Sequence, residues 1–582
     1  MAKKLYEVAD DVVDTDVLII GSEGAGARAA IEVAKYGLRV ALLSKGAITK
    51  TGATLTAGTD IDADGKSIVD LLGLPADERD TKEIFFKDML IEGRYINDQR
   101  ITERHVQDAA IRIKELMDWG MRISPKEPVG WAPGHSYRRG VSSTGREVCK
   151  ALIRGLQMYG SQIEYFENIM ASDLLTNKEI VVGTTAVDLN TGEFLVFSAK
   201  ATIIATGGGL KIYPFTTGNQ ELTGDGHAMA RRVGAQFLDI QQVQFLTTTF
   251  HNPPVSVRSI NPILNISPWL INIFGERFMT KYDPERLERS TRDMVAVGIM
   301  REIWDRKGWT DELGSYVLMS LKHHPANFID RWHKKEIQFG KEFIEHIKEN
   351  AVPAFSSSHF YCGGLRINER CETNVSGLYG SGEVTGGDHG ANRLSGNAVT
   401  QVVVQGKWAG EAAAQYSLKT RERDIDVKQV EESRKKVYAP LERKDGINST
   451  SIKRRIQNIA YQDVGVIKTD SRLKSAITEI AKLKKQISNI YTAHKSKRYN
   501  RPWIDAMEIR NMLDTLDVIA RSAIYRTESR GTHYRVDHPE SNNNQWLKNV
   551  IVQEINSDIK IWTEPLKIVE LGIKYMPKEW RN

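Results

Sequence analysis

Cysteine is scarce in this chain of 582 residues, which holds only Cys149, Cys362 and Cys371. None of the three belongs to a CxxC pair, and the sequence contains no CxxCH motif. A disulfide framework, a structural zinc site and an iron–sulfur cluster held by this chain alone are therefore disfavoured, as is an attached haem. We predict no metal site.

Long apolar runs are also missing. No run reaches the ~20 residues that a membrane-spanning helix needs. The first residues, MAKKLYEVADDVVDTDV, contain no apolar signal segment. We therefore expect a soluble protein of a reducing compartment, the cytoplasm, with any membrane contact made through partner subunits.

No block of like charge stands out in the sequence. The 80 basic and 74 acidic residues give a net charge of +6 and are spread along the chain, which does not indicate nucleic-acid binding. Repeats and low-complexity segments are absent from the sequence. The length predicts two to four domains.

Near the start of the chain lies a strand–turn–helix–strand pattern with a glycine-rich turn. Residues 15–20 (TDVLII) predict a buried strand, GSEGAG the turn, and LRVALL a second strand after a helix. Glycines let backbone N–H groups approach a pyrophosphate at a helix N-terminus, so Gly21, Gly24 and Gly26 are candidate contacts. Glu23 replaces the second glycine of GxGxxG and would repel a pyrophosphate unless it points away, and Ser44 replaces the usual ribose-binding acid. A structural βαβ turn is the alternative.

Three further stretches supply small and hydroxyl residues that suit a flavin. The loop from Ser44 to Gly58 can lie on the ring and bond the ribityl chain, a β-rich segment ends in ATGG, and TGDGHAMARRVGA puts an acid at a helix start. A plain loop and an ordinary helix cap are the alternatives. The candidate cofactor contacts are Ser44, Lys45, Gly46, Thr51, Ala57, Gly58, Thr206, Gly207 and Asp225.

The stretch SGLYGSGEV, followed by HGANRLSGNAVTQVVVQG from His389 to Gly406, organises the rest of the chain. It predicts a strand, a turn with Glu383, a loop with Arg393 and a buried helix whose N-terminus can stabilise electron density on a flavin. Glu383, Asn397 and Ala398 are candidate cofactor contacts, and Arg393 can hold a carboxylate by a forked contact. A strand–loop–helix unit with a surface arginine is the alternative.

The remaining segments predict a scaffold. Residues 80–120 indicate helices, and residues 134–156 indicate a loop that leads into another helix, with Arg138, Arg139 and Arg146 expected in solvent. Residues 167–208 alternate with period two and predict a small antiparallel sheet. Residues 240–358 interrupt the nucleotide-binding pattern as an insert, residues 407–526 predict a helical bundle, and residues 544–571 predict a β-hairpin.

Several motifs, taken in order, cover nearly the whole chain and carry a resemblance. They are GSEGAGARAA, VALLSKG, ATGGG, TGDGHAMARRVGA, GERFM, TRDMVA, HFYCGGL, GLYGSGEV, HGANRLSGN and ESRGTHYRVDHPE. The chain resembles the flavoprotein subunits of succinate dehydrogenase and fumarate reductase, with L-aspartate oxidase as a cousin. The resemblance implies an α/β fold with a Rossmann-like FAD-binding domain (1–239 and 359–410), an inserted α+β capping domain (240–358), a helical domain (411–540) and a small C-terminal β-containing domain (541–582).

The resemblance also implies hydride transfer between flavin N5 and a C=C or CH–CH bond of a carboxylic acid. Arg292 corresponds to the proton-shuttling arginine, and His359 and Arg393 correspond to groups that bind a substrate carboxylate. The residues that correspond to FAD contacts are Gly21, Gly24, Gly26, Ser44, Lys45, Asp225 and Glu383. Arginine normally stays charged, so a neighbouring acid must relay the proton. The resemblance further implies that electrons are exchanged with a separate iron–sulfur subunit, and we predict such a partner.

Two departures from the family pattern bear on function. Gly52 stands where respiratory members carry the histidine that bonds FAD covalently, so we predict non-covalent FAD. Leu246 replaces a substrate histidine, and NPILNISPWLINIF replaces a threonine–glutamate pair. Fumarate itself stays possible, but the substrate is expected to have an apolar or bulky far end.

Three other functions stay open. An L-aspartate oxidase-like amine oxidase would also lack the covalent histidine. A catalytically silent subunit could bind FAD and relay electrons, although Arg292, His359 and Arg393 argue against it. The adenylylsulfate reductase flavoprotein shares the general layout but not the HGANRL pattern.

Overall fold

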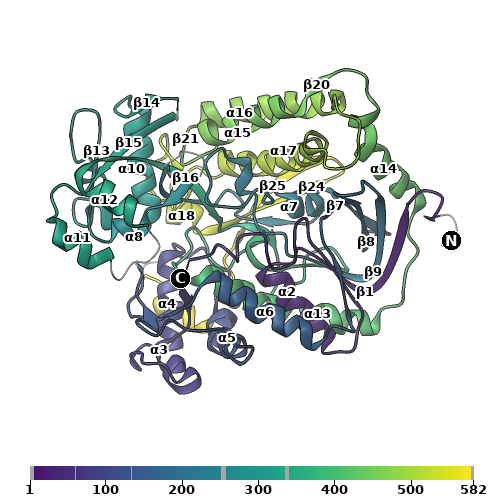
Figure 1. Ribbon diagram of the computed structural model, residues 1–582, viewed down its shortest axis with the longest axis horizontal. Coiled ribbons are helices and arrows are strands. Elements are labelled where there is room, and N and C mark those ends of the chain that lie inside the picture. The colour runs from purple at the N-terminus through teal and green to yellow at the C-terminus, as the bar shows by residue number, and fades with distance from the viewer. Residues whose placement is uncertain are drawn as a thin grey trace.

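The computed structural model describes residues 5–58, 60–132, 134–250, 257–312, 314–333 and 340–577. Figure 1 shows a body of sheet and helices, a lobe from the middle of the chain, and a layer of helices from the C-terminal part. The predicted α/β fold class is confirmed. The domain limits given above stay a prediction.

A seven-stranded sheet forms the body. Its parallel part runs in the order β6 (Ile163–Phe166), β2 (Val40–Leu43), β1 (Asp11–Ile20) and β9 (Phe194–Ile204), with β18 (Leu378–Gly380) beside the end of β9. The last six residues of β1 are buried, as expected of a central parallel strand. Because parallel strands end at the same edge, the turns that follow β1, β2, β9 and β18 come together there.

Helix α2 (Gly24–Ala34) follows β1 as predicted, and all its residues are buried. It packs against α13 (Asn397–Lys419), the helix predicted after Arg393. Gly406 and Gly410 of α13 allow the close approach, because a Cβ on either would lie 2.7 Å from a carbonyl oxygen of α2. Two segments almost 400 residues apart in sequence are thereby joined.

Strands β7 (Ile169–Asn177) and β8 (Ile180–Asp188) pair antiparallel with each other, and β8 pairs with β9, as the alternation predicted. They extend the central sheet, however, and do not form a small sheet of their own, because β9 also pairs with β1. Alternation shows which side chains are buried but not which strand is the next neighbour.

The lobe at the left of Figure 1 comes from residues 240–358. Strands β11 (Val243–Phe250), β16 (Val352–Tyr361) and β15 (Gly314–Ser320) pair antiparallel in that order, and α10 (Arg292–Trp304) packs on them. The lobe has a core of its own, which includes Val295, Ile299 and Val317. Strand β16 returns from the lobe to the body and carries His359 with it.

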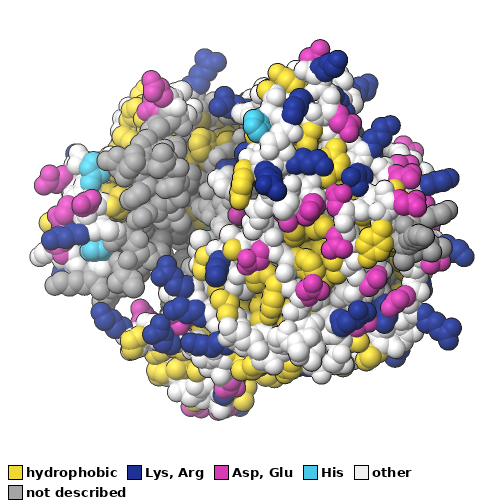
Figure 2. Space-filling view, turned by 45° about the vertical axis from the view of Figure 1, so that its right-hand side comes forward, with side chains coloured by type: hydrophobic (Ala, Val, Ile, Leu, Met, Phe, Trp, Pro, Cys, Tyr) yellow, Lys and Arg dark blue, Asp and Glu magenta, His cyan; other side chains and the backbone are white. Residues whose placement is uncertain are grey.

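The C-terminal third is helical and then β, as predicted. Its main helices are α14 (Val427–Glu442), α15 (Ser449–Asp463), α16 (Asp470–Gln486) and α17 (Arg501–Tyr525), and its hairpin is β24 (Lys548–Ile555) with β25 (Asp558–Pro565). Figure 2 shows basic and acidic side chains interspersed over the visible face. Within the described ranges, no helix is long and apolar enough to cross a membrane.

One charge expected in solvent lies in the core. Arg139 is fully buried, and its guanidinium donates to carboxylate oxygens of Asp80 (2.9 Å) and Asp88 (2.7 Å), the latter on α4 (Lys82–Glu92). The neighbouring Arg138 is exposed. The prediction was wrong for Arg139, because adjacent arginines look alike in sequence and only the tertiary fold brings two acids to one of them.

Candidate active site

One cavity of about 540 Å³ runs from the turn after β1 to the start of α10. Four helices begin at its wall: α2, α7 (Asp225–Arg232), α10 and α13. Helix N-termini carry unpaired N–H groups and a partial positive charge. The cavity is therefore suited to an anionic molecule.

The glycine-rich turn forms one part of this wall. Gly21 has a φ of +107°, and a Cβ there would lie 2.2 Å from the carbonyl oxygen of Ala205, so only glycine fits. Gly24 donates its N–H to Thr54 Oγ1 (3.1 Å), which ties the turn to the loop after β2. Gly26 does not line the cavity; a Cβ on it would lie 1.7 Å from the Gly21 oxygen, so it serves close packing.

Most of the predicted cofactor contacts share the cavity wall. They are Gly21, Gly24, Ser44, Lys45, Gly46, Thr51, Ala57, Gly58, Thr206, Gly207, Asp225, Glu383 and Ala398, whereas Asn397 begins α13 without lining the cavity. Buried hydroxyls of Ser22, Thr206 and Ser381 line it too and have no partner among the described residues. Such groups need hydrogen bonds, and FAD offers phosphate, hydroxyl and ring atoms to make them. The residues present fit FAD.

Lys45 is fixed by two acids at this wall. Its Nζ donates to Asp225 Oδ2 (3.0 Å) and pairs with Glu508 Oε1 (2.8 Å). Burial opposes the charge on Glu508, but Lys45, Lys453 and Arg501 together hold its pKa down at about 2. Asp225 is the first residue of α7 and not its cap, which is Gly224. A cation and an anion thus face the cavity in a fixed arrangement.

Glu383 lies in the turn after β18, as the sequence predicted. Its Oε1 accepts the N–H of Tyr361 (3.1 Å). A Cβ at position 208 would lie 2.6 Å from the same oxygen, so glycine at 208 leaves room for the carboxyl. Burial raises the pKa of Glu383 to about 7.

The three predicted catalytic side chains converge. Arg393 Nη2 lies 3.3 Å from His359 Nε2 and donates to Gln244 Oε1 (3.2 Å), which Arg292 Nη1 also approaches at 3.5 Å. Arg292 Nη2 donates to Ser395 Oγ (3.0 Å). All three line the cavity, and they come from α10, β16 and the loop before α13.

Burial sets the charges of this cluster. It lowers the pKa of Arg292 to about 9, with the nearby Arg393 adding to the effect. It also holds the pKa of His359 well below its usual value, again helped by the two arginines, so this histidine is neutral. Arginine has only donors, so His359 Nε2 accepts and Nδ1 carries the proton that faces Thr217 Oγ1 (2.8 Å).

The sequence reasoning missed Glu92, Asn392 and Gln244. Glu92 lines the cavity, and its Oε1 accepts from Asn392 Nδ2 (2.6 Å), whose own oxygen accepts from Gln244 Nε2 (2.6 Å). Burial, with Asp293 nearby, raises the pKa of Glu92 to about 7. Asn392 lay inside the HGANRL motif and Gln244 beside Leu246, which were usable signals, but nothing in the sequence marked Glu92.

Two leucines line the cavity on segments where the family pattern predicts polar groups. Leu246 on β11 is 1% exposed, and Leu264, at the end of α8 (Asn261–Leu264), is 7% exposed. Asn265 adds an uncharged polar group to the same wall. The described residues of these two segments bring no charge to the cavity.

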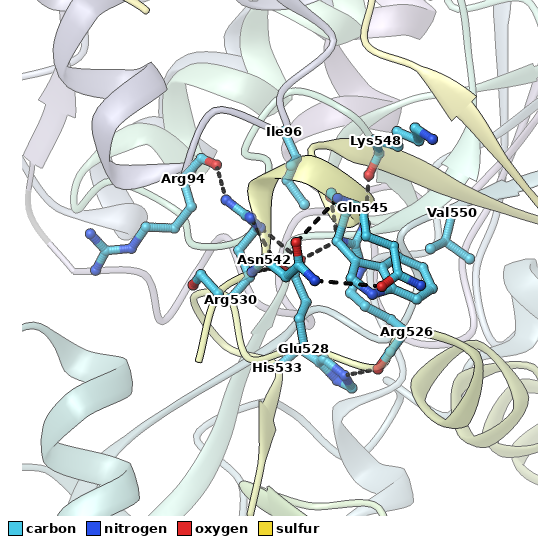
Figure 3. Close-up of polar contacts among 12 residues, drawn as sticks. Arg94, Ile96, Arg526, Glu528, Arg530, His533, Asn542, Gln545, Lys548 and Val550 are labelled. Carbon is cyan, nitrogen blue, oxygen red and sulfur yellow. Dashed lines mark hydrogen bonds and ion pairs between the residues drawn. The ribbon is translucent and has the colours of Figure 1, made fainter. Parts of the chain in front are cut away.

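The motif ESRGTHYRVDHPE supports the loop that carries Arg393. Glu528 is fully buried and accepts from Arg526 Nη1 (2.6 Å) and Arg530 Nε (2.8 Å), and Arg530 also donates to the carbonyl oxygen of Arg94 (Figure 3). Thr532 donates its N–H to the carbonyl oxygen of Ala391 (2.9 Å). The C-terminal motif therefore holds both the turn after Glu92 and the start of the Arg393 loop.

Comparisons with known proteins extend these observations. A family model described as an FAD binding domain matches residues 16–399. A second, described as the fumarate reductase flavoprotein C-term, matches residues 453–581. Together they cover most of the chain.

Individual proteins match over nearly the full length. A fumarate reductase (CoM/CoB) subunit of Methanothermobacter marburgensis is 32% identical over 565 residues, 95% of this chain and 98% of that protein. Chloroplastic L-aspartate oxidase of Arabidopsis thaliana is 30% identical over 556 residues, 90% of this chain and 81% of that protein. Sdh1 of Mycobacterium smegmatis, solved in complex with UQ1, is 28% identical with a TM-score of 0.86, over 96% of this chain and 95% of that one. This chain is an FAD-dependent oxidoreductase and belongs to the family of fumarate reductase and succinate dehydrogenase flavoprotein subunits, which has the L-aspartate oxidases as relatives.

Proposed function

We propose that the protein transfers a hydride between FAD and a C=C or CH–CH bond of a carboxylic acid whose far end is uncharged. The observation that supports this most directly is that Arg292, His359 and Arg393 share one cavity with Leu246 and Leu264. Bound FAD supplies the hydride chemistry. Binding, orientation and proton supply fall to side chains of this chain.

Arg393 binds the substrate carboxylate in this proposal, and His359 holds its guanidinium in place. Arg393 is buried, and its Nε has no partner among the described residues. A guanidinium with an unpaired donor in a dry site attracts a carboxylate strongly. The neutral His359 accepts from Arg393 through Nε2 and so orients the guanidinium toward the carboxylate without adding a second buried charge.

Arg292 delivers the proton, and Glu92 restores it. With a pKa of about 9, Arg292 loses a proton more easily than an exposed arginine. Glu92, with a pKa of about 7, is the stronger acid, so transfer of its proton to a deprotonated Arg292 is downhill. Glu92 thereby meets the need for a neighbouring acid.

A chain of polar contacts leads from Glu92 toward the surface. Asn392 Nδ2 contacts both Glu92 (2.6 Å) and Asp293 (3.3 Å). Asp293 Oδ2 in turn lies 3.6 Å from Arg94 Nη2, and the Arg94 side chain is 35% exposed. Asn392 donates to both acids and cannot itself carry a proton, so these contacts fix the Glu92 carboxyl and tie it to a side chain at the surface.

The leucines set the substrate class. A second carboxylate held against Leu246 and Leu264 would be desolvated and unpaired, which costs several kcal/mol. An alkyl or aromatic group would instead gain from burial there. We therefore infer that a 2-enoic monocarboxylic acid, or its saturated product, fits better than fumarate or succinate.

Reoxidation of the reduced protein tests the proposal. The flavin is reduced anaerobically with dithionite and mixed with fumarate, crotonate or cinnamate, and the return of its absorbance is followed. We expect a monocarboxylate to react at least ~10-fold faster than fumarate, the ratio that 1.4 kcal/mol gives. Fumarate reacting as fast as either monocarboxylate would overturn the assignment of the far end.

Arg292→Ala tests whether this chain is catalytic at all. We expect reoxidation to slow by ~10²–10⁴-fold, the usual worth of a positioned acid. Arg301→Ala, at the other end of the same helix, serves as the matched control and should react normally. If Arg292→Ala keeps the full rate, the silent electron-relay function is favoured.

An L-aspartate oxidase-like activity is the second candidate, and the 30% identity to the Arabidopsis enzyme supports it. It predicts that L-aspartate reduces the oxidised flavin and yields iminoaspartate. The leucines argue against it, because aspartate has two carboxylates. Bleaching of the flavin by L-aspartate would establish it.

We also propose that FAD is held without a covalent bond and that electrons are exchanged with an iron–sulfur partner subunit in the cytoplasm. Gly52, where the family pattern predicts the linking histidine, supports the first part. The three cysteines, each buried and free, support the second, since this chain supplies no CxxC cluster motif.

A further inference from the structure

Glu23 occupies the position at which dinucleotide-binding turns usually carry their second glycine. It precedes α2 and lines the cavity, yet its side chain makes no capping hydrogen bond. The side chain folds over Gly52 instead: a Cβ at position 52 would lie 2.4 Å from Glu23 Cγ. Gly52 also has a φ of +86°, so the two residues form a matched pair.

Both carboxyl oxygens of Glu23 are buried and make no hydrogen bond of normal geometry with the described residues. No ion pair found in those residues includes Glu23 either. The titratable groups that act on it are Glu221, which lines the same cavity, and Cys149 of α6 (Gly145–Met158). Burial raises the pKa of the Cys149 thiol to about 12, so it brings no positive charge.

Ionising a buried carboxyl group with no cation nearby is unfavourable, so such a group stays protonated. The turn that holds Glu23 is also the one whose glycines and helix N-terminus suit a pyrophosphate. Ionised Glu23 would therefore meet a second negative charge as soon as FAD is bound. We propose that Glu23 is a cofactor-retention residue that permits tight FAD binding only while its carboxyl is neutral.

The sign of the pH dependence follows from the surroundings. Burial, reinforced by Glu221, raises the pKa of Glu23 to about 8, and the backbone N–H groups of Leu55 and Thr51 offset only part of this rise. FAD favours the protonated form, so its affinity is constant below that pH and falls above it, by at most about tenfold for each pH unit. This inference depends on FAD as cofactor and not on the substrate.

The test uses the holoprotein. It is diluted into buffers from about pH 6.5 to about pH 9.5, and FAD release is followed by the rise of flavin fluorescence, with the dissociation constant measured by retitration. We expect the dissociation constant of the unchanged protein to stay constant up to about pH 8 and to rise above it, and FAD release to become faster at the high end of the range, because bound FAD raises the pKa of Glu23 further. Glu23→Gln should release FAD at a rate that does not depend on pH.

Two further variants sharpen the test. Glu23→Gly restores the glycine of the turn and should also lack the pH step, which covers a failure of Glu23→Gln to fold. Glu221→Gln removes the cavity glutamate whose charge raises the pKa of Glu23, so it should keep the step and move it to lower pH. The proposal is overturned if unchanged protein releases FAD equally at all pH values, if it releases none, or if Glu23→Gln or Glu23→Gly keeps the step.

Discussion

Burial shifts the pKa values of single residues in this protein and so determines their chemistry. Arg292 and Glu92 have ordinary pKa values that differ by many units, yet burial brings them to about 9 and about 7. A proton can pass between groups whose pKa values lie this close. The residue that decides whether Arg292 can act repeatedly is therefore Glu92.

Glu92→Gln removes that proton and keeps the contact with Asn392. We expect steady-state turnover of the fastest enoate, with excess dithionite as electron donor, to slow by ~10²-fold or more, because Glu92 restores the Arg292 proton between turnovers. In the unchanged protein the rate should fall as the pH rises through about 7, because only protonated Glu92 can pass a proton on. The variant should lose this step when rates are measured from about pH 6 to about pH 9.

Glu83→Gln is the control for this experiment, since Glu83 is exposed at the other end of α4. It should react like the unchanged protein at every pH. A Glu92→Gln variant that kept the pH step would assign the step to another group and contradict the proposed relay.

At the scale of elements, the site depends on turns and helix ends held together from far apart. The four helix N-termini at the cavity belong to segments that begin between residues 24 and 397. The C-terminal motif holds the Arg393 loop through Thr532 and the turn after Glu92 through Arg530. Loss of contacts within this motif should therefore lower the free energy of unfolding of the whole molecule.

Glu528→Gln tests the motif. Removing the carboxylate leaves the buried Arg530 without its anion, while Arg526 keeps Asp239, so we expect the free energy of unfolding to drop by about 3 kcal/mol. Glu564→Gln breaks a half-buried pair with Arg366 and should cost less than about 1 kcal/mol. Thermal or urea unfolding of both variants compares the two costs; equal losses would show that the buried cluster adds nothing special.

At the scale of the whole molecule, the chain has a cavity for one redox cofactor and no CxxC motif for a second. The proposed function therefore assigns the further electron carriers to a partner subunit. Charges of both signs are interspersed over the face seen in Figure 2, so that view gives no sign of a docking site set by charge alone.

A complex purified from its natural source should therefore contain iron and acid-labile sulfide in proportion to FAD. The reason is that the partner must carry the clusters that this chain lacks the cysteines to hold. Iron, sulfide and flavin are measured on the same preparation. Complexes with flavin but neither iron nor sulfide would contradict the proposed partner.

Much of the fold could be predicted from local patterns. The β1–α2–β2 unit, the buried helix α13 and the C-terminal hairpin each follow from glycine positions and hydrophobic periodicity within a short stretch. Arg139 and Glu92 could not be predicted, because their burial and partners come from segments distant in sequence. Periodicity is local, whereas the pKa of a side chain depends on everything packed around it.

The sequence by itself determined the α/β architecture, FAD as the cofactor and the family, since glycine turns and short motifs are written in consecutive residues. Only the tertiary structure decided that Arg292, His359 and Arg393 meet, that Glu92 stands beside them, and that the Glu23 side chain is buried over Gly52. The physical reason is that contact, burial and charge coupling depend on distance in space, which the order of residues does not fix until the chain has folded.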